Sequence, residues 1–394
     1  MQHPKWVLSA CQCAMGVAPA VAFLLVMATG GALRAQGVKY TNLYNFPGSV
    51  SSEPNWGVIR DSAGNLYGTT IFGGNYGVGT VFKLDTSGTQ TILCNFADGA
   101  YPSNIVLDAA GNIYGATANG GPYEVPFQNL GYGLVYKLDT SGTETVLYNF
   151  TGGTDGEYPG GVIRDAAGNI YGTAAGGALG NGLVYKLDAS GAETVLYSFT
   201  GGADGGSPWV PLIRDSSGNL YGTTASGGLG SGVVFKLDTS GTETVLYSFT
   251  GGADGGSPNI IIRDSAGNIY GTAAAGGASG YGVVFKLDTT GTETVLHSFS
   301  GGTDSMYPDG LIRDPLGNLY GTAGGLNLSS GFIKGYGVVF KLSPKGKFTV
   351  LHEFNHAEGA FPAPGLIRDS AGTLYGTTEL GGTSDWGVVF SLKP

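Results

Sequence analysis

From residue 40 onwards, apolar residues recur in a unit of about 50 residues that contains four short runs typical of β-strands. In the copy that spans residues 258–299, apolar runs of two to four residues alternate with Gly, Asn, Asp and Ser, which favour turns. The four predicted strands are Ile260–Asp264, Ile269–Ala273, Val283–Asp288 and Glu293–Phe299. The connections between them are short, so each unit is expected to form one antiparallel four-stranded meander.

The apolar residues within these runs do not alternate strictly with polar ones. A sheet with one solvated face would alternate, so these strands are expected to be covered on both faces. A unit of this size cannot cover its own sheet twice, and its neighbours must therefore pack against it. The units are too long for the coils of a parallel β-helix and lack the 3.6-residue spacing of a helical solenoid, which favours the radial packing of a β-propeller.

The number of units predicts an all-β, seven-bladed β-propeller over residues 36–394. The last copy of the third strand, Val389–Leu392, ends two residues before the end of the sequence, so the final unit lacks its fourth strand. A matching strand, Thr41–Phe46, precedes the first complete unit. We expect it to pair with Gly387–Leu392, because this pairing closes the ring and removes two exposed strand edges. The Tyr-Gly pair of the second strand marks the seven units at Tyr67, Tyr114, Tyr171, Tyr221, Tyr270, Tyr320 and Tyr375.

Residues 1–35 have the pattern of a secretory signal peptide that is cleaved near Gln36. Lys5 supplies the positive start, Val17–Met27 the apolar segment, and Leu33-Arg34-Ala35 the small residue before the cleavage site. The alternative is a retained membrane anchor, although the apolar segment is shorter than the roughly 20 residues of a spanning helix. We therefore expect a secreted or cell-envelope protein, periplasmic or extracellular, with no stable membrane span after cleavage.

Charge and cysteine content narrow the classes of partner. The sequence has 19 Lys and Arg and 29 Asp and Glu; Lys5 and Arg34 leave with the leader, so the mature net charge is 17 − 29 = −12. This charge disfavours nucleic acids and anionic membranes as partners. Two of the three cysteines lie in the leader, which leaves Cys94 without a disulfide partner. Cys94 occupies the strand position of Tyr148, so it is expected to be a buried packing residue. The protein is expected to be a monomer.

The meander divides the connections between two ends of the ring. The links between strands one and two and between strands three and four are short and uniform, and we call their end the short-turn end. The links between strands two and three and between blades vary in length, and their end is the variable-loop end. It includes two enlarged loops, Asn119–Tyr132 and Gly324–Tyr336. Binding residues on rigid scaffolds concentrate on variable loops, so we expect the functional site at the variable-loop end.

Two recurring features of the variable loops form the predicted binding site. One is an acid beside Gly, and the other is an aromatic residue beside the proline that precedes each first strand. Carboxylates could bind sugar hydroxyls or Ca²⁺, and aromatic faces could stack on sugars; no other cofactor is expected. The alternative, favoured because nearly every blade has these features, is that they build turns and pack between blades. The acids are Asp98, Asp155, Asp204, Asp254, Asp304 and Glu358, and the aromatics are Tyr101, Tyr158, Trp209, Tyr307 and Phe361.

Other charged residues also recur, which points to architecture rather than chemistry. Six arginines precede an Asp at the end of the first strand and predict repeated ion pairs or caps near the axis. Glutamates that begin the fourth strand are expected to be solvated, and His297 and His352 are expected to replace Tyr in the core. No Gly-x-Ser-x-Gly, phosphate-loop or HExxH motif is present. The arginines are Arg60, Arg164, Arg214, Arg263, Arg313 and Arg368, and the glutamates are Glu144, Glu193, Glu243 and Glu293.

The repeated strings resemble a known family. Asn-Leu-Tyr-Gly-Thr-Thr at Asn65–Thr70, Gly-Val-Val-Phe-Lys-Leu at Gly232–Leu237, and Ser-Phe-Thr-Gly-Gly-x-Asp-Gly-x-x-Pro at Ser198–Pro208 resemble the GloVer tandem repeat of secreted bacterial proteins. The likeness extends from about residue 40 to residue 394. It implies an exported repeat protein of a family without an established activity. A looser likeness to NHL-type and streptogramin-lyase-like propellers rests on the strand, Asp-x-x-Gly-Asn, strand pattern and transfers no catalytic residue.

Three functions are compatible with the sequence. The first is a non-enzymatic binding or interaction module for carbohydrate or another surface polymer. The second is a hydrolase or lyase that uses carboxylates at the variable-loop end, which would require an acid that is specific to one blade and has a raised pKa. The third is a purely structural envelope protein.

Overall fold

The computed structural model describes residues 33–35, 37–97, 100–123, 131–324, 326–327 and 333–394. The predicted leader, except residues 33–35, lies outside this range, as do Asp98 and much of the two enlarged loops. The described part forms one compact unit within Ala32–Pro394, built from strands. No helix within these ranges has the length and apolar character needed to cross a bilayer.

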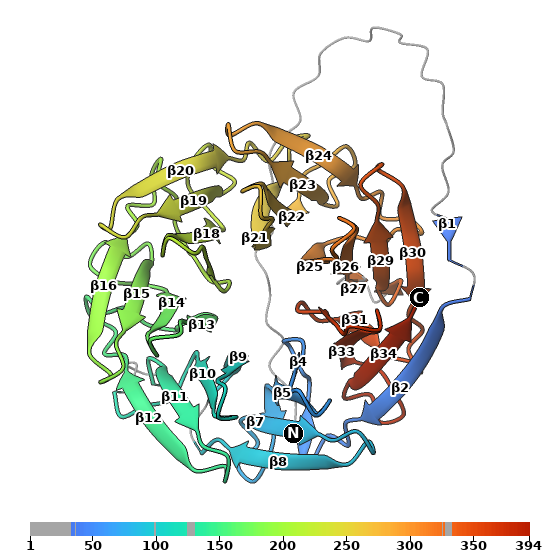
Figure 1. Cartoon of the computed structure of the whole chain (residues 1–394), viewed down its shortest axis with the longest axis horizontal. Coiled ribbons are helices and arrows are strands. Elements are labelled where there is room, and N and C mark those ends of the chain that lie inside the picture. Colours follow the sequence, from blue (N-terminus) through green and yellow to red (C-terminus); the bar gives the residue numbers. More distant parts are fainter. Residues whose placement is uncertain (1–32, 36, 98–99, 124–130, 325, 328–332) are drawn as a thin grey trace, which may run out of the picture. The chain divides into compact units, whose positions relative to one another are not determined.

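The strands form seven antiparallel sheets around an axis, which confirms the predicted seven-bladed β-propeller (Figure 1). Each blade starts next to the axis and ends at the periphery. Blades 1 to 3 consist of β4 (Ile59–Arg60), β5 (Leu66–Thr70), β7 (Thr80–Leu84) and β8 (Gln90–Asn95); β9 (Pro102–Leu107), β10 (Ile113–Thr117), β11 (Leu134–Leu138) and β12 (Glu144–Asn149); and β13 (Val162–Arg164), β14 (Ile170–Ala174), β15 (Leu183–Leu187) and β16 (Glu193–Ser198).

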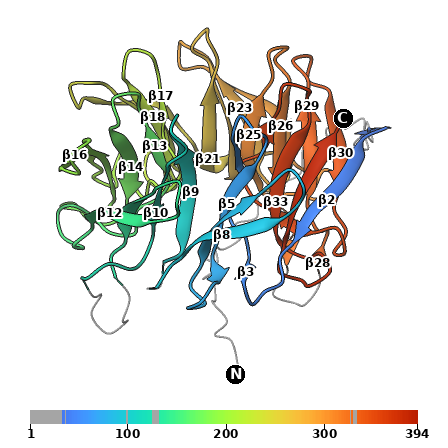
Figure 2. The same cartoon turned by 60° about the horizontal axis from the view of Figure 1, so that its bottom comes forward.

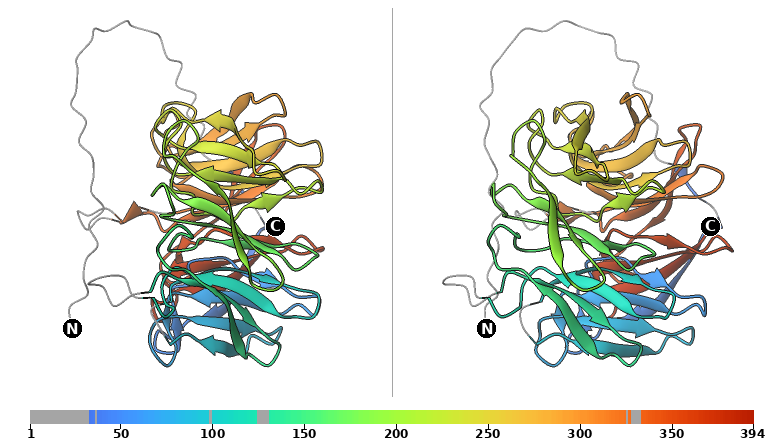
Figure 3. Two further views of the ribbon diagram at one scale, coloured as in Figure 1. Left: turned by 90° about the vertical axis from the view of Figure 1, so that its left-hand side faces the viewer. Right: turned by 60° about the vertical axis from the view of Figure 1, so that its left-hand side comes forward.

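Blades 4 to 7 repeat this order, and the edge-on views show their sheets following one another around the ring (Figure 3). They consist of β17 (Ile213–Arg214), β18 (Leu220–Thr224), β19 (Val233–Leu237) and β20 (Glu243–Ser248); β21 (Gly256–Arg263), β22 (Ile269–Ala275), β23 (Val283–Leu287) and β24 (Glu293–Ser298); β25 (Pro308–Arg313), β26 (Leu319–Ala323), β29 (Val338–Leu342) and β30 (Phe348–Glu353); and β31 (Ala360–Pro362) with β32 (Ile367–Arg368), β33 (Leu374–Leu380), β34 (Val388–Lys393) and β2 (Lys39–Asn45).

The N-terminal strand closes the ring as predicted. β2 pairs antiparallel with β34 from Lys39 opposite Lys393 to Asn45 opposite Val388, and the register shifts between Asn42 and Tyr44. The fourth strand of blade 7 is therefore supplied from the other terminus. Upstream of it, β1 (Leu33–Arg34) adds a short parallel strand to the outer edge of β30. Residues 33–35 belong to the predicted leader, whose cleavage remains a prediction.

Two additional two-stranded sheets lie at the variable-loop end, at the lower edge of Figure 2. β3 (Ser51–Ser52) pairs with β6 (Phe72–Gly73) in blade 1. β27 (Leu326–Asn327) pairs with β28 (Ile333–Lys334) in the enlarged loop of blade 6. The β3–β6 pairing recurs at the equivalent positions of other blades, for example between Gly206 and Ser226 and between Gly256 and Ala275, whereas β27–β28 belongs to the enlarged loop of blade 6.

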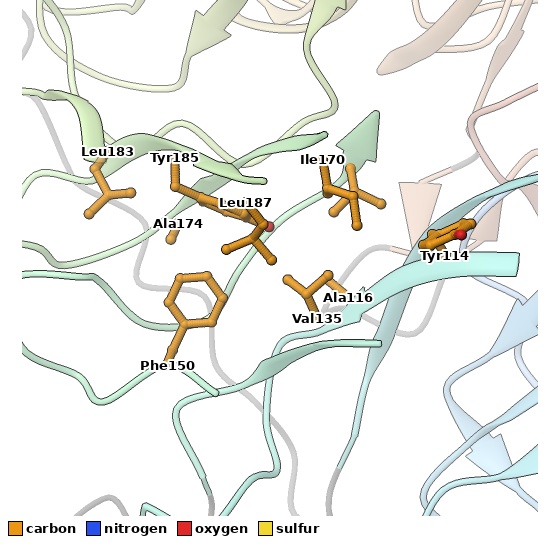
Figure 4. Close-up of a cluster of buried hydrophobic side chains, with 10 residues drawn as sticks. Tyr114, Ala116, Val135, Phe150, Ile170, Ala174, Leu183, Tyr185 and Leu187 are labelled. Atoms are coloured by element: carbon orange, nitrogen blue, oxygen red, sulfur yellow. The ribbon is translucent and has the colours of Figure 1, made fainter. Parts of the chain in front are cut away.

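The core lies between the blades, as predicted from strands in which apolar and polar residues do not alternate strictly. In the contact between blades 2 and 3, Phe150, Tyr185 and Leu187 pack together in a fully buried cluster (Figure 4). At every contact a Phe that follows the fourth strand meets an aromatic ring on the third strand of the next blade, edge to face, with ring centroids 5.1–5.5 Å apart. This geometry matches the preferred arrangement of aromatic pairs. Seven equivalent contacts therefore bury both faces of every sheet.

At the short-turn end, a charged network links neighbouring blades. In all seven blades an Asp of the Asp-x-x-Gly-Asn turn, or its variant Asp369, accepts a hydrogen bond from the Tyr hydroxyl of the second strand at 3.0–3.3 Å. The six arginines place their guanidinium groups over the Tyr ring of the preceding blade, where Arg214, for example, also interacts electrostatically with Asp165. Arg164 lies closest, 4.6 Å from the centroid of Tyr114. The other pairs are Arg60–Tyr375, Arg214–Tyr171, Arg263–Tyr221, Arg313–Tyr270 and Arg368–Tyr320.

Replacing Tyr185 by Phe should stabilise the protein. The Tyr185 ring is fully buried, and its hydroxyl has no hydrogen-bond partner. Phe occupies the same position in five blades, for example Phe235. Removing an unsatisfied buried hydroxyl is expected to raise the free energy of unfolding by about 1 kcal/mol, measured by urea denaturation. The reciprocal change, Phe235→Tyr, should destabilise by a similar amount; a Tyr185→Phe variant that is less stable than the native chain would contradict this.

Candidate functional site

The first strand of every blade begins beside a proline at the variable-loop end, close to the axis. We call the residues that flank these seven prolines the axial rim; they are 53–55, 101–103, 158–160, 207–209, 257–259, 307–309 and 361–363. Strands β9, β21 and β25, each of which contains a rim proline near its start, are innermost in the ring (Figure 1). The rim therefore surrounds the axis at the end where the variable loops emerge.

The residue before each proline has a left-handed backbone. Its φ is positive in all seven blades, 42° at Tyr101 and 57° at Ser207, for example. Such conformations are uncommon for residues other than Gly and cost roughly 1–3 kcal/mol each. Contacts with the preceding blade compensate for this cost: the Tyr307 amide donates to the Tyr281 carbonyl at 3.0 Å. Pro308 packs against Gly282, where a Cβ would lie 2.6 Å from its Cδ.

This backbone presents aromatic side chains at the rim. Tyr101 and Tyr307, which precede prolines, are 41% and 39% exposed, and Trp209, which follows one, is 43% exposed. Tyr158 and Phe361 occupy the same position as Tyr101 and are half-buried. All five predicted aromatic residues thus lie in the axial rim, where they can contact a ligand, although their binding role remains a prediction.

The predicted acids lie in the inter-blade loops that follow the outer strands. Their carboxylates accept hydrogen bonds from residues of the same loop. Asp204 accepts hydrogen bonds from the backbone amide and the hydroxyl of Thr200 and from the hydroxyl of Tyr197. Partial burial would raise the pKa of Asp204, but these bonds outweigh it and lower the pKa. Asp155, Asp254 and Asp304 accept equivalent hydrogen bonds from the amide and the hydroxyl of the Thr or Ser that lies four residues earlier in the chain. The geometry agrees with the turn-forming interpretation, and a role for these acids in ligand or Ca²⁺ binding is untested.

Two other acids, which sequence reasoning missed, are specific to single blades. Asp309 follows Pro308 at the start of the first strand of blade 6, and Glu379 lies near the end of the second strand of blade 7. The equivalent residues in other blades carry no charge; Asn259 and Ala274 are examples. The sequence shows that Asp309 and Glu379 depart from the repeat. It does not show that the two residues lie near each other in the fold.

The environment of these two acids perturbs their ionisation. Asp309 keeps some solvent exposure, but protein surrounds it on most sides, and this burial raises its pKa to about 6. Burial, followed by the negative charges of Asp309 and Glu53, raises the pKa of Glu379 to about 7. Glu53 precedes Pro54 in the rim of blade 1. Carboxyl groups from blades 6, 7 and 1 therefore influence one another on one side of the axial rim.

The glutamates of the fourth strand correct one prediction. Glu144 is exposed as expected, but Glu193, Glu243 and Glu293 are half-buried, and each has a buried Oε1 without a hydrogen-bond partner. Burial, followed by the charge of Asp155, Asp204 or Asp254 in the adjoining loop, raises the pKa of each Glu to about 7. The sequence could not show this, because the two carboxyl groups of each pair belong to different turns and meet only where blades pack.

The same interface position accepts other pairs of residues. Tyr44 donates a hydrogen bond to Gln90 at 2.6 Å where blade 7 meets blade 1. His297 stacks on Phe348 at 3.8 Å, and Tyr40 stacks on His352 at 4.4 Å. The two histidines therefore replace Tyr in inter-blade packing, as predicted. Cys94 is buried, and burial, followed by the charge of Glu144, raises the pKa of its thiol to about 12, which disfavours a nucleophilic thiolate.

Comparisons with known proteins support the fold and the repeat. The model of the Gloeobacter/Verrucomicrobia repeat matches residues 127–331 and 230–394, which confirms the resemblance drawn from the sequence. A streptogramin B lyase structure aligns with a TM-score of 0.62 and 14% identity over 90% of this chain and 97% of that chain. An inactive virginiamycin B lyase from Staphylococcus aureus, solved with quinupristin, aligns with a TM-score of 0.61 and 12% identity over 91% and 99%. No curated protein matches.

Identity at this level establishes a shared fold and transfers no activity. Among the described residues, no group of three or more His, Cys, Asp and Glu side chains is arranged to hold a metal ion. The candidate site is the axial rim, with its exposed aromatic rings and the carboxyl groups on one side of it.

Replacing Glu193, Glu243 and Glu293 together by Gln should stabilise the protein above pH 7. Their folded-state pKa lies above the unfolded value of about 4.5, so the native state holds more protons between pH 4.5 and 7 and loses stability as the pH rises through that window. Gln mimics the protonated form. After allowance for solvent screening, we expect a gain of about 1 kcal/mol per site at pH 8 and little change at pH 4.5, measured by urea denaturation.

Glu144→Gln is the matched control, because Glu144 has the same strand position but an exposed side chain. It should leave the pH dependence of stability unchanged. The loss of stability below pH 4 should persist in the triple variant, since hydrogen bonds lower the pKa of Asp204, Asp254 and Asp304. A triple variant with the pH profile of the native chain would show that the three glutamates are not coupled to folding.

Proposed function

We propose that this chain, which belongs to the family of the Gloeobacter/Verrucomicrobia repeat, is a binding module that recognises carbohydrate or a related surface polymer at the axial rim. The observation that carries the proposal is the exposure of Tyr101, Trp209 and Tyr307 on a backbone held rigidly around the axis. Flat aromatic faces suit the apolar faces of sugar rings, and a pre-organised rim reduces the entropy lost on binding. An exported protein of the cell envelope would meet such polymers.

A specific observation favours a second candidate. Asp309 and Glu379 meet the requirement for a blade-specific acid with a raised pKa; Asp309 lies in the axial rim, and Glu379 lies beside the rim on β33. One carboxyl group that is protonated near neutral pH beside another that is ionised could act as general acid and general base in the hydrolysis or elimination of a glycosidic bond. Because the charge of Asp309 raises the pKa of Glu379, the two carboxyl groups would share a proton, so that one is ionised and acts as the base while the other is protonated and acts as the acid.

Binding should depend on the rim aromatics. Binding is measured by pull-down with insoluble polysaccharides and on a glycan array. Trp209→Ala combined with Tyr307→Ala should lower the affinity for any glycan that the native chain binds by roughly tenfold or more, because each ring contributes about 1 kcal/mol of stacking. Leu316→Ala is the control, since Leu316 is 81% exposed on a short turn at the opposite end. A native chain that retains no glycan, or a rim variant that binds as tightly as the control, would remove the basis for the proposal.

Catalysis is tested by product release from any polysaccharide that binds. If the second candidate is right, reducing ends or unsaturated products should accumulate, and either Asp309→Asn or Glu379→Gln should lower kcat by about 100-fold or more while binding persists. The assay follows reducing sugar and absorbance near 235 nm on the native and variant chains. Tight binding without product from the native chain would leave the non-enzymatic module as the function.

A further inference from the structure

The contact between blades 1 and 2 lacks a ring that the other six contacts have. At those six, the residue two positions before the Phe that follows the fourth strand is a Tyr or a His. Its ring packs edge to face on that Phe, with centroids 4.8–5.2 Å apart. In blade 1 this residue is Cys94, so Phe96 has no ring at this position. The six rings are those of Tyr44, Tyr148, Tyr197, Tyr247, His297 and His352.

The loop that leads from blade 1 to blade 2 is also the shortest of the inter-blade loops. Pro102 follows Phe96 by six residues, whereas Pro159 follows Phe150 by nine. Two separate departures from the repeat, a smaller side chain and a shorter loop, therefore remove atoms from the same contact.

A cavity of about 470 Å³ lies at this contact. Its lining residues include Phe96 from the end of blade 1 and Leu134, Glu144 and Val146 from the outer strands of blade 2. Cys94 adjoins it through Glu144, whose Oε2 atom lies 3.7 Å from the thiol Sγ. The lining residues that the structure describes lie outside the axial rim, so a ligand in this cavity would occupy a second site.

The cavity corresponds to the space that a tyrosine fills at the next contact. There Tyr148 and Val195 pack against the buried cluster that contains Phe150 and Leu183. Phe150, Leu183 and Val195 hold the same repeat positions as three of the residues that line the cavity. Val146, the counterpart of Val195, is 44% exposed, whereas Val195 is half-buried. The missing ring thus leaves an apolar surface of blade 2 uncovered.

We propose that the cavity binds a phenolic ring from outside the chain, which takes the place of the tyrosine that blade 1 lacks. The ring packs on Phe96 and covers Val146, and its hydroxyl donates a hydrogen bond to the Glu144 carboxylate. The contact between blades 7 and 1 has an equivalent bond: the Tyr44 hydroxyl donates at 2.6 Å to Gln90, which holds the strand position of Glu144. A carboxylate accepts several hydrogen bonds, so Glu144 can accept this one in addition to the contacts it already makes.

The size of the cavity fits such a ligand. Small-molecule sites are mostly apolar with a few polar groups, and they span roughly 300–1,000 Å³. An apolar cavity of about 150 Å³ is enough to hold benzene, so this one has room for a phenol with a further substituent. A free phenolic compound and a tyrosine side chain of a second polypeptide offer the same chemistry, and the test separates these two sources.

The test uses p-cresol, which is the tyrosine side chain as a free molecule. Isothermal titration should detect binding to the native chain, and Cys94→Tyr should weaken it by about tenfold or more because the new ring fills the cavity. Val146→Phe fills the cavity from blade 2 and should weaken binding likewise; Val146 is exposed, so this variant serves if Cys94→Tyr does not fold. The control Leu316→Tyr adds the same side chain at the opposite end and should bind p-cresol as the native chain does.

The hydroxyl is tested separately. Toluene, which lacks it, should bind about fivefold more weakly than p-cresol, and Glu144→Leu should weaken p-cresol by a similar factor without weakening toluene. A blocked tyrosine tripeptide that binds about tenfold tighter than p-cresol would identify a polypeptide as the source of the ring, and equal or weaker binding would identify a free phenolic compound.

Three results would overturn the proposal. They are no binding of p-cresol to the native chain, binding that both cavity-filling variants leave unchanged, and toluene that binds as tightly as p-cresol. None of them bears on glycan binding at the axial rim. Thermal melting of each variant checks that the propeller remains folded.

Discussion

Every blade of this protein depends on the pairing of β2 with β34. A four-stranded sheet with two apolar faces is stable only when both faces are covered, and in a ring each blade covers its neighbours. An open array would leave a bare face at each end and unpaired strand edges in blade 7. The antiparallel ladder from Lys39–Lys393 to Asn45–Val388 removes these liabilities by joining the two ends of the chain. The seven edge-to-face aromatic contacts then form an uninterrupted series around the axis.

The repeat also explains how the ring tolerates change. The inter-blade contact of the fourth strands is a pair in which one or both members change: His297 with Phe348 and Tyr40 with His352 replace both the Tyr and the Glu of other blades, whereas Tyr44 with Gln90 replaces the Glu alone. Packing complementarity across the contact constrains the pair rather than either residue alone. The buried carboxyl groups of Glu193, Glu243 and Glu293 are the least favourable version of this contact, since each meets a second acid across it.

The two ends of the ring have separate roles for a physical reason. At the short-turn end, Asp, Tyr, Arg and Lys recur in nearly every blade and neutralise one another, so they rigidify the inner strands. At the variable-loop end, the strained residue before each proline is held by the preceding blade, which lets its side chain face solvent in a fixed direction. The short-turn end thus holds the inner strands in place, and the variable-loop end exposes aromatic rings on that fixed backbone.

The amino-acid sequence by itself determined the strands, the number of blades, the closing strand and the end that carries the variable loops, because these follow from local turn chemistry and from a period repeated seven times. It also identified Tyr101, Tyr158, Trp209, Tyr307 and Phe361 as rim residues, since they flank a recurrent proline. Tertiary structure alone decided which acids come together. Asp204 is occupied by its own turn, whereas Asp309, Glu379 and Glu53 come from three blades that lie far apart in the chain. Their meeting depends on the rotation of each blade against the next, and that angle is set by packing across the ring rather than by any local pattern.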